Sequence, residues 1–223
     1  MASTPAALGT ILAVAARGHF PRPDGTTTVV PQPCHRDAGV ISFTAHSVVF
    51  TDEDPQWVHA TLASLDCDPL AATMNPLFLA AFHERTGRST DTTDLMTVAG
   101  ALPGAPGPEL GLREIDDPDH PRVVRARKRR DDVRVWSTAG GTAGGGVLVI
   151  GRGLAGRWEA AIEVEEGVRH RGLGRALAGA ARHLVPDGDV VWAQQSTGNA
   201  RSVRAFQAAG YRPVGAEALF FAR

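Results

Sequence analysis

The sequence predicts an α/β protein built on a mixed, twisted sheet with helices on both faces. Residues 158–165 alternate apolar and polar side chains, which is the pattern of a strand with one buried face. Residues 172–183 then place Leu and Ala on one stripe at helical spacing. An apolar strand at 190–193 and a helix at 199–209 repeat the order, so strands and helices alternate along this half of the chain.

The first half of the sequence predicts a further α/β part. Residues 1–33 are rich in Pro, Thr and Ala, which predicts a short helix followed by an extended, loosely packed arm. Residues 39–51 alternate in polarity and predict a strand pair or one bent strand. Two helices at 57–65 and 77–85 each follow an N-cap residue and a Pro, and a strand is expected at 94–101.

A stretch rich in Pro and Gly at 103–111 predicts a boundary between two parts of the chain. We therefore expect an N-terminal α/β region at 1–111, which sets substrate choice or is a degenerate copy of the second domain, and a ligand-binding domain at 112–223. The second domain is expected to add a basic helix at 119–130, strands at 133–137 and 147–150 around a Gly-rich turn at 140–146, and a final strand at 217–222.

The bulk composition is that of a globular protein. The 223 residues are 43% hydrophobic and 21% charged, which suits one large domain or two small ones. A net charge of −1 gives no overall attraction to nucleic acid or anionic lipid. No run of about 18 apolar residues exists for a membrane span. Cys34 and Cys67 show no metal-like spacing, and a reducing cytoplasm is the expected compartment.

Residues 164–177 form a strand end and an Arg- and Gly-rich turn that opens directly into a helix, and this arrangement predicts an anion site. Gly172 and Gly174 let the backbone approach a ligand, and the first N–H groups of a helix have no intrahelical acceptor. Cations at a helix start oppose the helix dipole unless an anion is bound there. Three guanidinium groups at this end therefore favour a bound anion, namely those of Arg169, Arg171 and Arg175.

The segment Arg169-His170-Arg171-Gly172-Leu173-Gly174 satisfies the motif Gln/Arg-x-x-Gly-x-Gly/Ala and so resembles the GNAT acyltransferase superfamily. His170 stands where the family often has Gly. The resemblance extends over about 136–223 and implies a GNAT fold with acetyl-CoA as co-substrate. It implies that these six residues and Arg175 wrap the pyrophosphate. It also implies that the pantetheine arm meets the backbone of Val164, Glu165 and Glu166.

A second segment also resembles this superfamily. Asn199, Ser202, Phe206, Gly210 and Tyr211 follow the pattern Asn-x-x-(Ala/Ser)-x-x-x-Tyr-x-x-x-Gly-(Phe/Tyr). The resemblance implies that the Asn contacts the pantetheine or the backbone, in addition to acting as an ordinary N-cap. The tyrosine that protonates the departing thiolate in the family is Phe206 here, so this acid is absent. Tyr211 is a weaker substitute, because the residue after the Gly usually packs.

Amine acylation requires that a base take a proton from the attacking amine. Glu163 is the first candidate, because it lies on the strand beside the expected pantetheine site. Glu159 and Glu165 lie on the same face and are alternatives. The competing interpretation is that all three are solvent-exposed carboxylates without a catalytic role.

The resemblance predicts an N-acetyltransferase that moves an acetyl group to a primary amine of a small molecule or peptide, as a monomer or a homodimer. Two alternatives stay open. The basic segment around Arg125–Arg130 either is a solvated helix face or contacts tRNA, as in GNAT-fold enzymes that use aminoacyl-tRNA as donor. Alternatively, the chain senses acyl-CoA without catalysis, with Phe206 marking the lost chemistry.

Other ligand classes find no support in the sequence. Residues 151–156 read Gly-x-Gly-x-x-Gly, but a strand pattern follows instead of a helix, so a glycine hairpin is expected in place of a dinucleotide site. The histidines show no spacing with Cys or carboxylates that is typical of a metal site, and no metal is expected.

Overall fold

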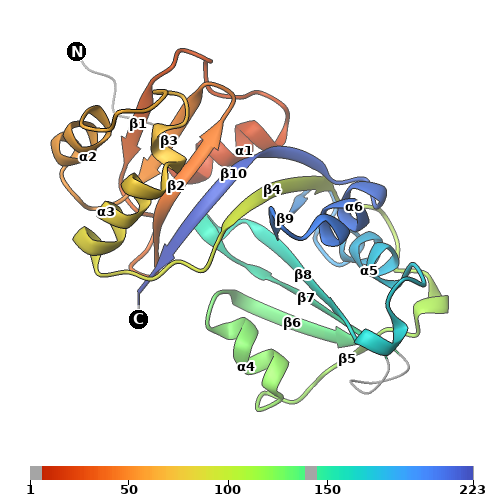
Figure 1. Cartoon of the computed structure of the whole chain (residues 1–223). Helices are drawn as coiled ribbons and strands as arrows, with labels where there is room; N and C mark the ends of the chain where they lie inside the picture. Colours follow the sequence, from red (N-terminus) through yellow and green to blue (C-terminus); the bar gives the residue numbers. More distant parts are fainter. Residues whose placement is uncertain (1–6, 139–144, 223) are drawn as a thin grey trace. The chain divides into compact units, whose positions relative to one another are not determined.

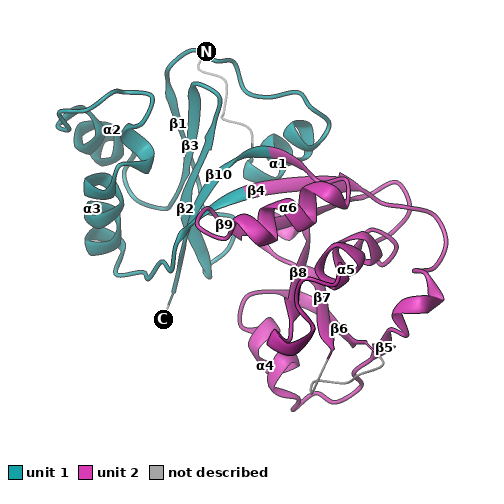
Figure 2. Cartoon of the chain, turned by 45° about the vertical axis from the view of Figure 1, so that its right-hand side comes forward, with its two compact units in different colours: residues 1–95, 214–223 teal, residues 96–213 magenta. Residues whose placement is uncertain are grey.

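Two groups of strands, each with its own helices, make up this computed structural model, which describes residues 7–138 and 145–222 (Figure 1). Unit 1 comprises the chain up to Leu95 and from Val214 onward, and unit 2 comprises Met96–Pro213 (Figure 2). The boundary predicted at residue 111 falls inside unit 2. Strand β4 (Thr93–Gly100) already carries the chain from one unit into the other before the Pro- and Gly-rich stretch begins.

Unit 1 combines strands of mixed direction with several helices. Its strands follow the order β1-β3-β2-β10, with β1 and β3 parallel and the other neighbours antiparallel. Residues 39–51 therefore belong to a hairpin and not to one bent strand, and part of the predicted loose arm is a paired strand. The elements are α1 (Leu8–Ala16), β1 (Thr27–Val30), β2 (Asp37–Phe43), β3 (His46–Phe50), α2 (Pro55–Ala63), a 3-10 turn (Ala72–Met74), α3 (Pro76–Thr86) and β10 (Arg212–Phe221).

The predicted helix starts in unit 1 are confirmed by their caps. The Asp54 carboxylate accepts a hydrogen bond from the Gln56 N–H at 2.8 Å, and the Asn75 side chain accepts one from Leu77 at 2.9 Å. A Pro fills the first helical position in both helices. Helices α2 and α3 cover one face of the unit 1 strands, and α1 lies on the other face (Figures 1 and 2).

The strands of unit 2 also run in mixed directions, in the order β4-β9-β8-β7-β6-β5. Strands β5 to β8 form an antiparallel meander, and β8 pairs in parallel with β9. The elements after β4 are β5 (Arg113–Glu114), α4 (Pro121–Arg127), β6 (Asp131–Ser137), β7 (Gly146–Arg152), β8 (Trp158–Val164), α5 (Leu173–Ala181), β9 (Val190–Ser196) and α6 (Ala200–Ala208), with 3-10 turns at Pro108–Leu110, Leu154–Gly156 and Glu166–Val168.

The strand pattern of unit 2 places its helices on opposite faces. Leu148 of β7 packs in one core cluster with Leu177 of α5 and Phe206 of α6. Its neighbour Val147 packs in another cluster with Val123 of α4. Successive residues of a strand point to opposite faces, so α5 and α6 cover one face and α4 covers the other. The predicted class, α/β with a mixed sheet and helices on both sides, is confirmed.

Several predicted bounds change in the structure. Helix α4 ends at Arg127 and not at 130, because the following residues turn inward and bring Arg130 against a buried carboxylate. Strand β10 begins at Arg212, well before the predicted 217. The predicted Gly-rich turn lies largely outside the described residues, and its last member, Gly146, is the first residue of β7. The two predicted helices after β8 and β9 are confirmed as α5 and α6.

Candidate active site

The ladder between the parallel strands β8 and β9 covers only the beginning of β8. The pairs are Trp158 with Val191 and Glu159 with Trp192, whereas β8 continues to Val164. In the described part of the chain, this ladder does not extend over the last five residues of β8. Backbone N–H and C=O groups on the β9 side of β8 are therefore available to a ligand just before the chain turns toward α5.

The turn between β8 and α5 folds the chain back through left-handed conformations. His170 has a φ of 65° and Gly172 a φ of 82°. A left-handed conformation disfavours most side chains, and Gly172 adopts it at the N-cap without strain. Because Gly172 has no side chain, it supplies no side-chain cap to the first N–H groups of α5. Those groups stay free to bind an anion from outside the helix.

Exposed cations surround this helix start. Arg169, Arg171 and Arg175 are all exposed, as the sequence predicts for an anion site. The Arg169 Nε donates a hydrogen bond to the Val164 carbonyl at 3.0 Å and ties the turn to the end of β8. Among the described residues, neither Arg171 nor Arg175 contacts a carboxylate. These two positive charges lie at the positive end of the α5 dipole without a counter-charge.

An open depression of 520 Å³ runs along α5 from the same turn. Gly172 and Arg175 lie at the helix start, and the residues after α6 close the other side. The full lining is Gly172, Arg175, Ala176, Gly179, Arg182, Ala208, Ala209 and Gly210. A ligand bound at the α5 start would thus find a continuous surface leading away from the turn.

Helix α6 begins just after the carboxyl end of β9, next to the strand that leads into α5. The Asn199 side chain accepts a hydrogen bond from the Ser202 N–H at 3.1 Å, so the predicted N-cap is confirmed. The carboxyl ends of adjacent parallel strands lie at the same edge of a sheet, and ligands of α/β proteins commonly bind there. The contacts of Asn199 and Ser202 with a ligand stay a prediction.

The two aromatic residues of the second motif are packed inside the protein. Phe206 is 2% exposed, and its ring meets that of Tyr211 edge to face with the centroids 4.9 Å apart. The Tyr211 hydroxyl is buried and has no hydrogen-bond partner among the described residues. Burial raises the pKa of this phenol well above its usual range. Neither residue presents an exposed proton donor, and Phe206 is a core residue in this structure.

Glu159 is buried, and the expectation that it is a solvent-exposed carboxylate on β8 is wrong. Its carboxylate accepts hydrogen bonds from Arg157 at 2.8 Å and from Gln194 at 2.8 Å. The Arg130 Nε lies 3.1 Å from the other carboxylate oxygen. Burial acts to raise the pKa of Glu159, but the charges of Arg157 and Arg130 outweigh it and hold the pKa below its ordinary value. Glu159 is thus a structural anion.

Glu163 has the exposure that a catalytic base requires. Its side chain is 45% exposed, and it lies opposite Val147 of β7 on the face of the sheet that α4 covers. Both carboxylate oxygens accept hydrogen bonds from the guanidinium of Arg122 in α4. This partner lies 41 residues away in the sequence, so no local pattern predicts it. Glu165 lies beyond the strand end, before the 3-10 turn.

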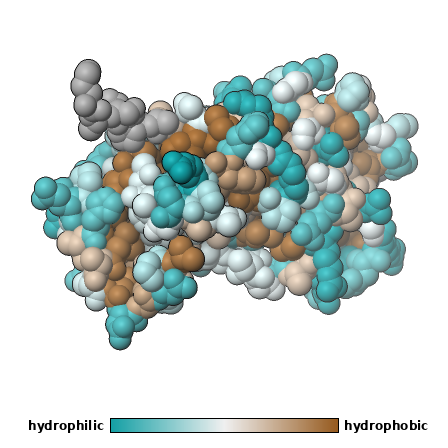
Figure 3. All heavy atoms as spheres, turned by 90° about the horizontal axis from the view of Figure 1, so that it is seen from above, coloured by the Kyte–Doolittle hydropathy of each residue, from teal (hydrophilic) through white to brown (hydrophobic). Residues whose placement is uncertain are grey.

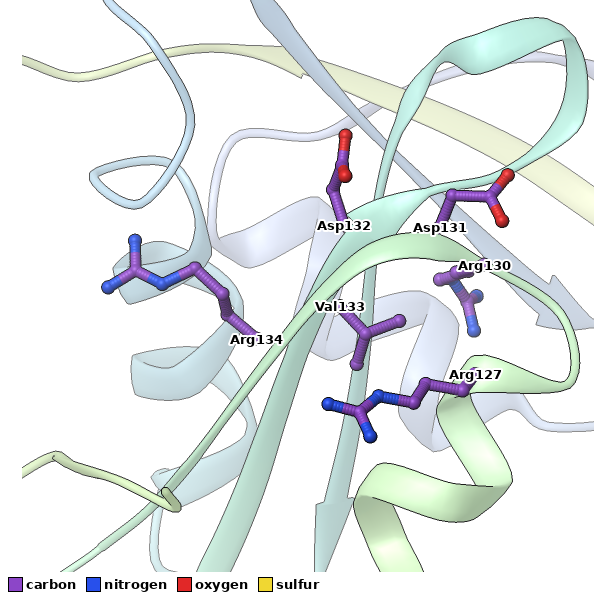
Figure 4. A pocket seen from close by; sticks show the side chains of 6 residues that line it. All are labelled: Arg127, Arg130, Asp131, Asp132, Val133 and Arg134. Atoms are coloured by element: carbon purple, nitrogen blue, oxygen red, sulfur yellow. The ribbon is translucent and has the colours of Figure 1, made fainter. Parts of the chain in front are cut away.

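The basic segment that includes Arg125–Arg130 exposes less positive charge than its sequence indicates. Three arginines within or beside it are held by glutamates, in the pairs Arg122 with Glu163, Arg130 with Glu159 and Arg134 with Glu114. Figure 4 shows a depression of 570 Å³ in this region, lined by Arg127, Arg130, Asp131, Asp132, Val133 and Arg134. The two aspartates point away from the Arg127 guanidinium, and they offset much of the positive charge of this surface.

Two further properties follow from the described residues, 7–138 and 145–222. Within them, no three side chains of His, Cys, Asp or Glu gather in a way that could hold a metal ion. No helix there is both long and apolar enough to cross a bilayer.

Comparisons with known proteins find similar solved structures at low sequence identity. No family model matches the sequence, and no curated protein does. Similar solved structures include a GNAT-family acetyltransferase from Novosphingobium aromaticivorans, at 16% identity and a TM-score of 0.44, covering 60% of this chain and 66% of that one. A GCN5-related N-acetyltransferase from Kribbella flavida has 16% identity and a TM-score of 0.41, covering 64% and 63%. Each match spans less than two thirds of the other chain.

A third similar structure is a tandem GNAT protein from the clavulanic acid biosynthesis pathway, solved without acetyl-CoA. It has 16% identity and a TM-score of 0.37, and the match covers 65% of this chain and 57% of that one. These neighbours belong to the superfamily that the two sequence motifs resemble.

Proposed function

We propose that this chain is an N-acyltransferase that moves an acetyl group from acetyl-CoA to a primary amine. The reversal between β8 and α5 is the observation that carries the proposal. It combines a left-handed glycine, helix N–H groups without a side-chain cap, and the guanidinium groups of Arg171 and Arg175 without carboxylate partners. A diphosphate supplies the negative charge that this arrangement lacks.

The position of this reversal suits the rest of coenzyme A. The part of the β8 edge that does not pair with β9 ends at Val164, directly before the turn. Backbone groups of Val164, Glu165 and Glu166 would hydrogen-bond the amides of the pantetheine arm. Arg169 already bridges the strand end and the turn through the Val164 carbonyl, so the two parts of the site are held together.

Acetyl-CoA supplies a thioester carbonyl that a neutral amine can attack. We assign Glu163, directly or through a water molecule, to accept the proton that the amine loses as its nitrogen bonds to the carbonyl carbon. Both Glu163 oxygens accept a hydrogen bond from the Arg122 guanidinium, so full access of an amine to this carboxylate requires Arg122 to move aside. The carbon–sulfur bond then breaks, and the sulfur keeps the electron pair.

The departing thiolate takes its proton from water in this proposal. Phe206 has no hydroxyl, and the Tyr211 hydroxyl is buried with a raised pKa. A thiolate is a weak base because the pKa of its thiol is only about 8.5, so its departure requires no dedicated acid. The absent tyrosine is thus compatible with turnover.

Thermal denaturation with and without acetyl-CoA tests the proposal. A ligand at 100 times its Kd adds about 2.7 kcal/mol to the free energy of unfolding. We expect stabilisation of this order for the wild-type chain and at least tenfold weaker binding for Arg171→Glu, because a repelling charge replaces an attracting one. Arg113→Glu is the matched control, since this exposed arginine lies in β5, three strands away from β8.

The same preparations are then assayed for CoA release with a panel of primary amines. Release that depends on both substrates supports the transferase. Stabilisation without release from any amine would identify an acyl-CoA sensor instead. The proposal is wrong if acetyl-CoA leaves the melting temperature unchanged or if Arg171→Glu binds as well as the wild type.

A further inference from the structure

We infer that the acceptor is an amino acid whose amine and carboxylate replace the two partners of the Arg122–Glu163 pair. This inference rests on the proposed function and specifies its substrate class. The pair joins α4 to the last part of β8, and both Glu163 oxygens are engaged by one guanidinium. The side chains are 23% and 45% exposed, so a ligand in solvent can reach both.

The pair lies where an acceptor has to bind. Glu163 is next to Val164, where the β8 edge leads into the proposed coenzyme A turn. It points to the α4 face, whereas its neighbours Ile162 and Val164 pack in the core on the α5 face. An amine that meets Glu163 therefore approaches from the α4 side, which is also the side of Arg122.

Charge decides which amines bind well. A cationic amine that displaces Arg122 from Glu163 leaves a partly exposed guanidinium without a counter-charge, and this loss opposes binding modestly. A molecule with both an ammonium and a carboxylate gives each side chain a new partner. The exchange is electroneutral, and the planar guanidinium suits a carboxylate that accepts two parallel hydrogen bonds.

Arg122 is well placed to act as the recognition residue. Its backbone N–H donates to His120 Nδ1 at 3.2 Å, which fixes the start of α4. The nearby Arg130 and Arg134 form ion pairs with other glutamates, Glu159 and Glu114 respectively. Among the described residues, Arg122 is the cation that contacts Glu163.

The reaction then converts an amino acid and acetyl-CoA into an N-acetylamino acid and CoA. The amino acid nitrogen gains a bond to the acetyl carbon, and the thioester carbon–sulfur bond breaks. The bound ammonium first gives one proton to water and becomes the neutral nucleophile. As the nitrogen bonds to the acetyl carbon it loses a second proton to Glu163 or its water, and the thiolate takes one proton from solvent, so that one proton is released overall. The substrate carboxylate is unchanged and stays on Arg122 during the step.

A panel of amino acids, each with its carboxamide and its decarboxylated amine, tests the inference through CoA release. The carboxamide keeps the size and the amine but lacks the charge. We expect kcat/KM to be about 10- to 100-fold higher for the free amino acid of the best series. In Arg122→Gln the amino acid should lose this advantage through a raised KM, so that the ratio of its kcat/KM to that of the carboxamide falls toward one. Arg125→Gln, one turn along α4 and exposed, is the matched control.

The outcomes separate this inference from the proposed function. Equal kcat/KM for amino acids and their carboxamides, or an unchanged ratio in Arg122→Gln, overturns the inference while acetylation itself stands. Failure of acetyl-CoA to bind or to react with any amine overturns both. Acetyl-CoA stabilisation of Arg122→Gln, measured by denaturation, shows that a lost preference reflects the acceptor side and not misfolding.

Discussion

The carboxylate of Glu159 lies on the polar side of β8, yet its side chain is only 7% exposed. Arg157 and Arg130 hold its pKa below the ordinary value of 4.5 in spite of burial. The charged form is therefore favoured by folding. This contribution is fully present above pH 4.5 and is lost as the pH falls below that value toward the folded-state pKa.

We expect Glu159→Gln to lower the free energy of unfolding at pH 7 by about 3 kcal/mol, because two guanidinium groups stay buried without a counter-charge. Denaturant titrations between pH 3 and 7 check this. The difference from the wild type should shrink as the pH falls from 4.5, where the unfolded chain takes up a proton at this carboxyl, toward the lower folded-state pKa. Glu84→Gln removes an exposed carboxylate and is the control. A difference independent of pH would contradict this account.

At the scale of elements, α5 and the start of β7 approach so closely that only glycine fits between them. A Cβ on Gly146 would lie 2.6 Å from Leu177 Cδ1 and 3.2 Å from the Glu163 carbonyl oxygen. Leu177 is fully buried, so its side chain would have to shift within the core. The strand that carries Glu163 and the helix that forms the anion site are thus fixed at one spacing.

Gly146→Ala should therefore destabilise the protein by about 1–3 kcal/mol through overpacking. It should also weaken coenzyme A stabilisation, because α5 has to shift away from the sheet. Gly179→Ala is the matched control: its Cβ meets nothing within 4 Å, and alanine favours the helix. Chemical denaturation of both variants measures the effect. Equal stability of the two would show that α5 adapts without cost.

At the scale of the whole molecule, the net charge of −1 and the paired arginines beside α4 argue against tRNA as a ligand. Contacts with nucleic acid phosphates require available cations and show a steep dependence on salt. We expect no saturable binding of tRNA at about 150 mM salt, measured by fluorescence anisotropy. Tight binding that is lost when Arg125 and Lys128 become glutamine would favour the aminoacyl-tRNA alternative.

Local patterns predicted most of the elements but fewer of their bounds. The alternation in 158–165 and the stripe in 172–183 became β8 and α5, because period and caps are short-range signals. Strand β10 was predicted too short. Pro213 lies near its start, and a Pro normally argues against a strand at that position. The division into units depends on which strands neighbour each other, which no local pattern records.

Local sequence likewise predicts one part of the candidate site and misses another. The turn at Arg169–Gly172 was visible because all of its parts are contiguous in sequence. The burial of Glu159 could not be predicted from the sequence, because its partners come from separate segments, including Arg130 and Gln194. Likewise, Arg122 and Glu163 are brought together only when α4 packs on the sheet. Alternation gives the side to which a residue points, but not what covers that side.

The topology of unit 1 has a consequence for biosynthesis. Its strand β2 hydrogen-bonds to β10, and β10 leaves the ribosome only after all of unit 2 has emerged. Domains generally fold as units while the chain is being made. Unit 2 can thus acquire its native structure first, while the nascent first segment waits with one sheet edge unpaired and open to aggregation.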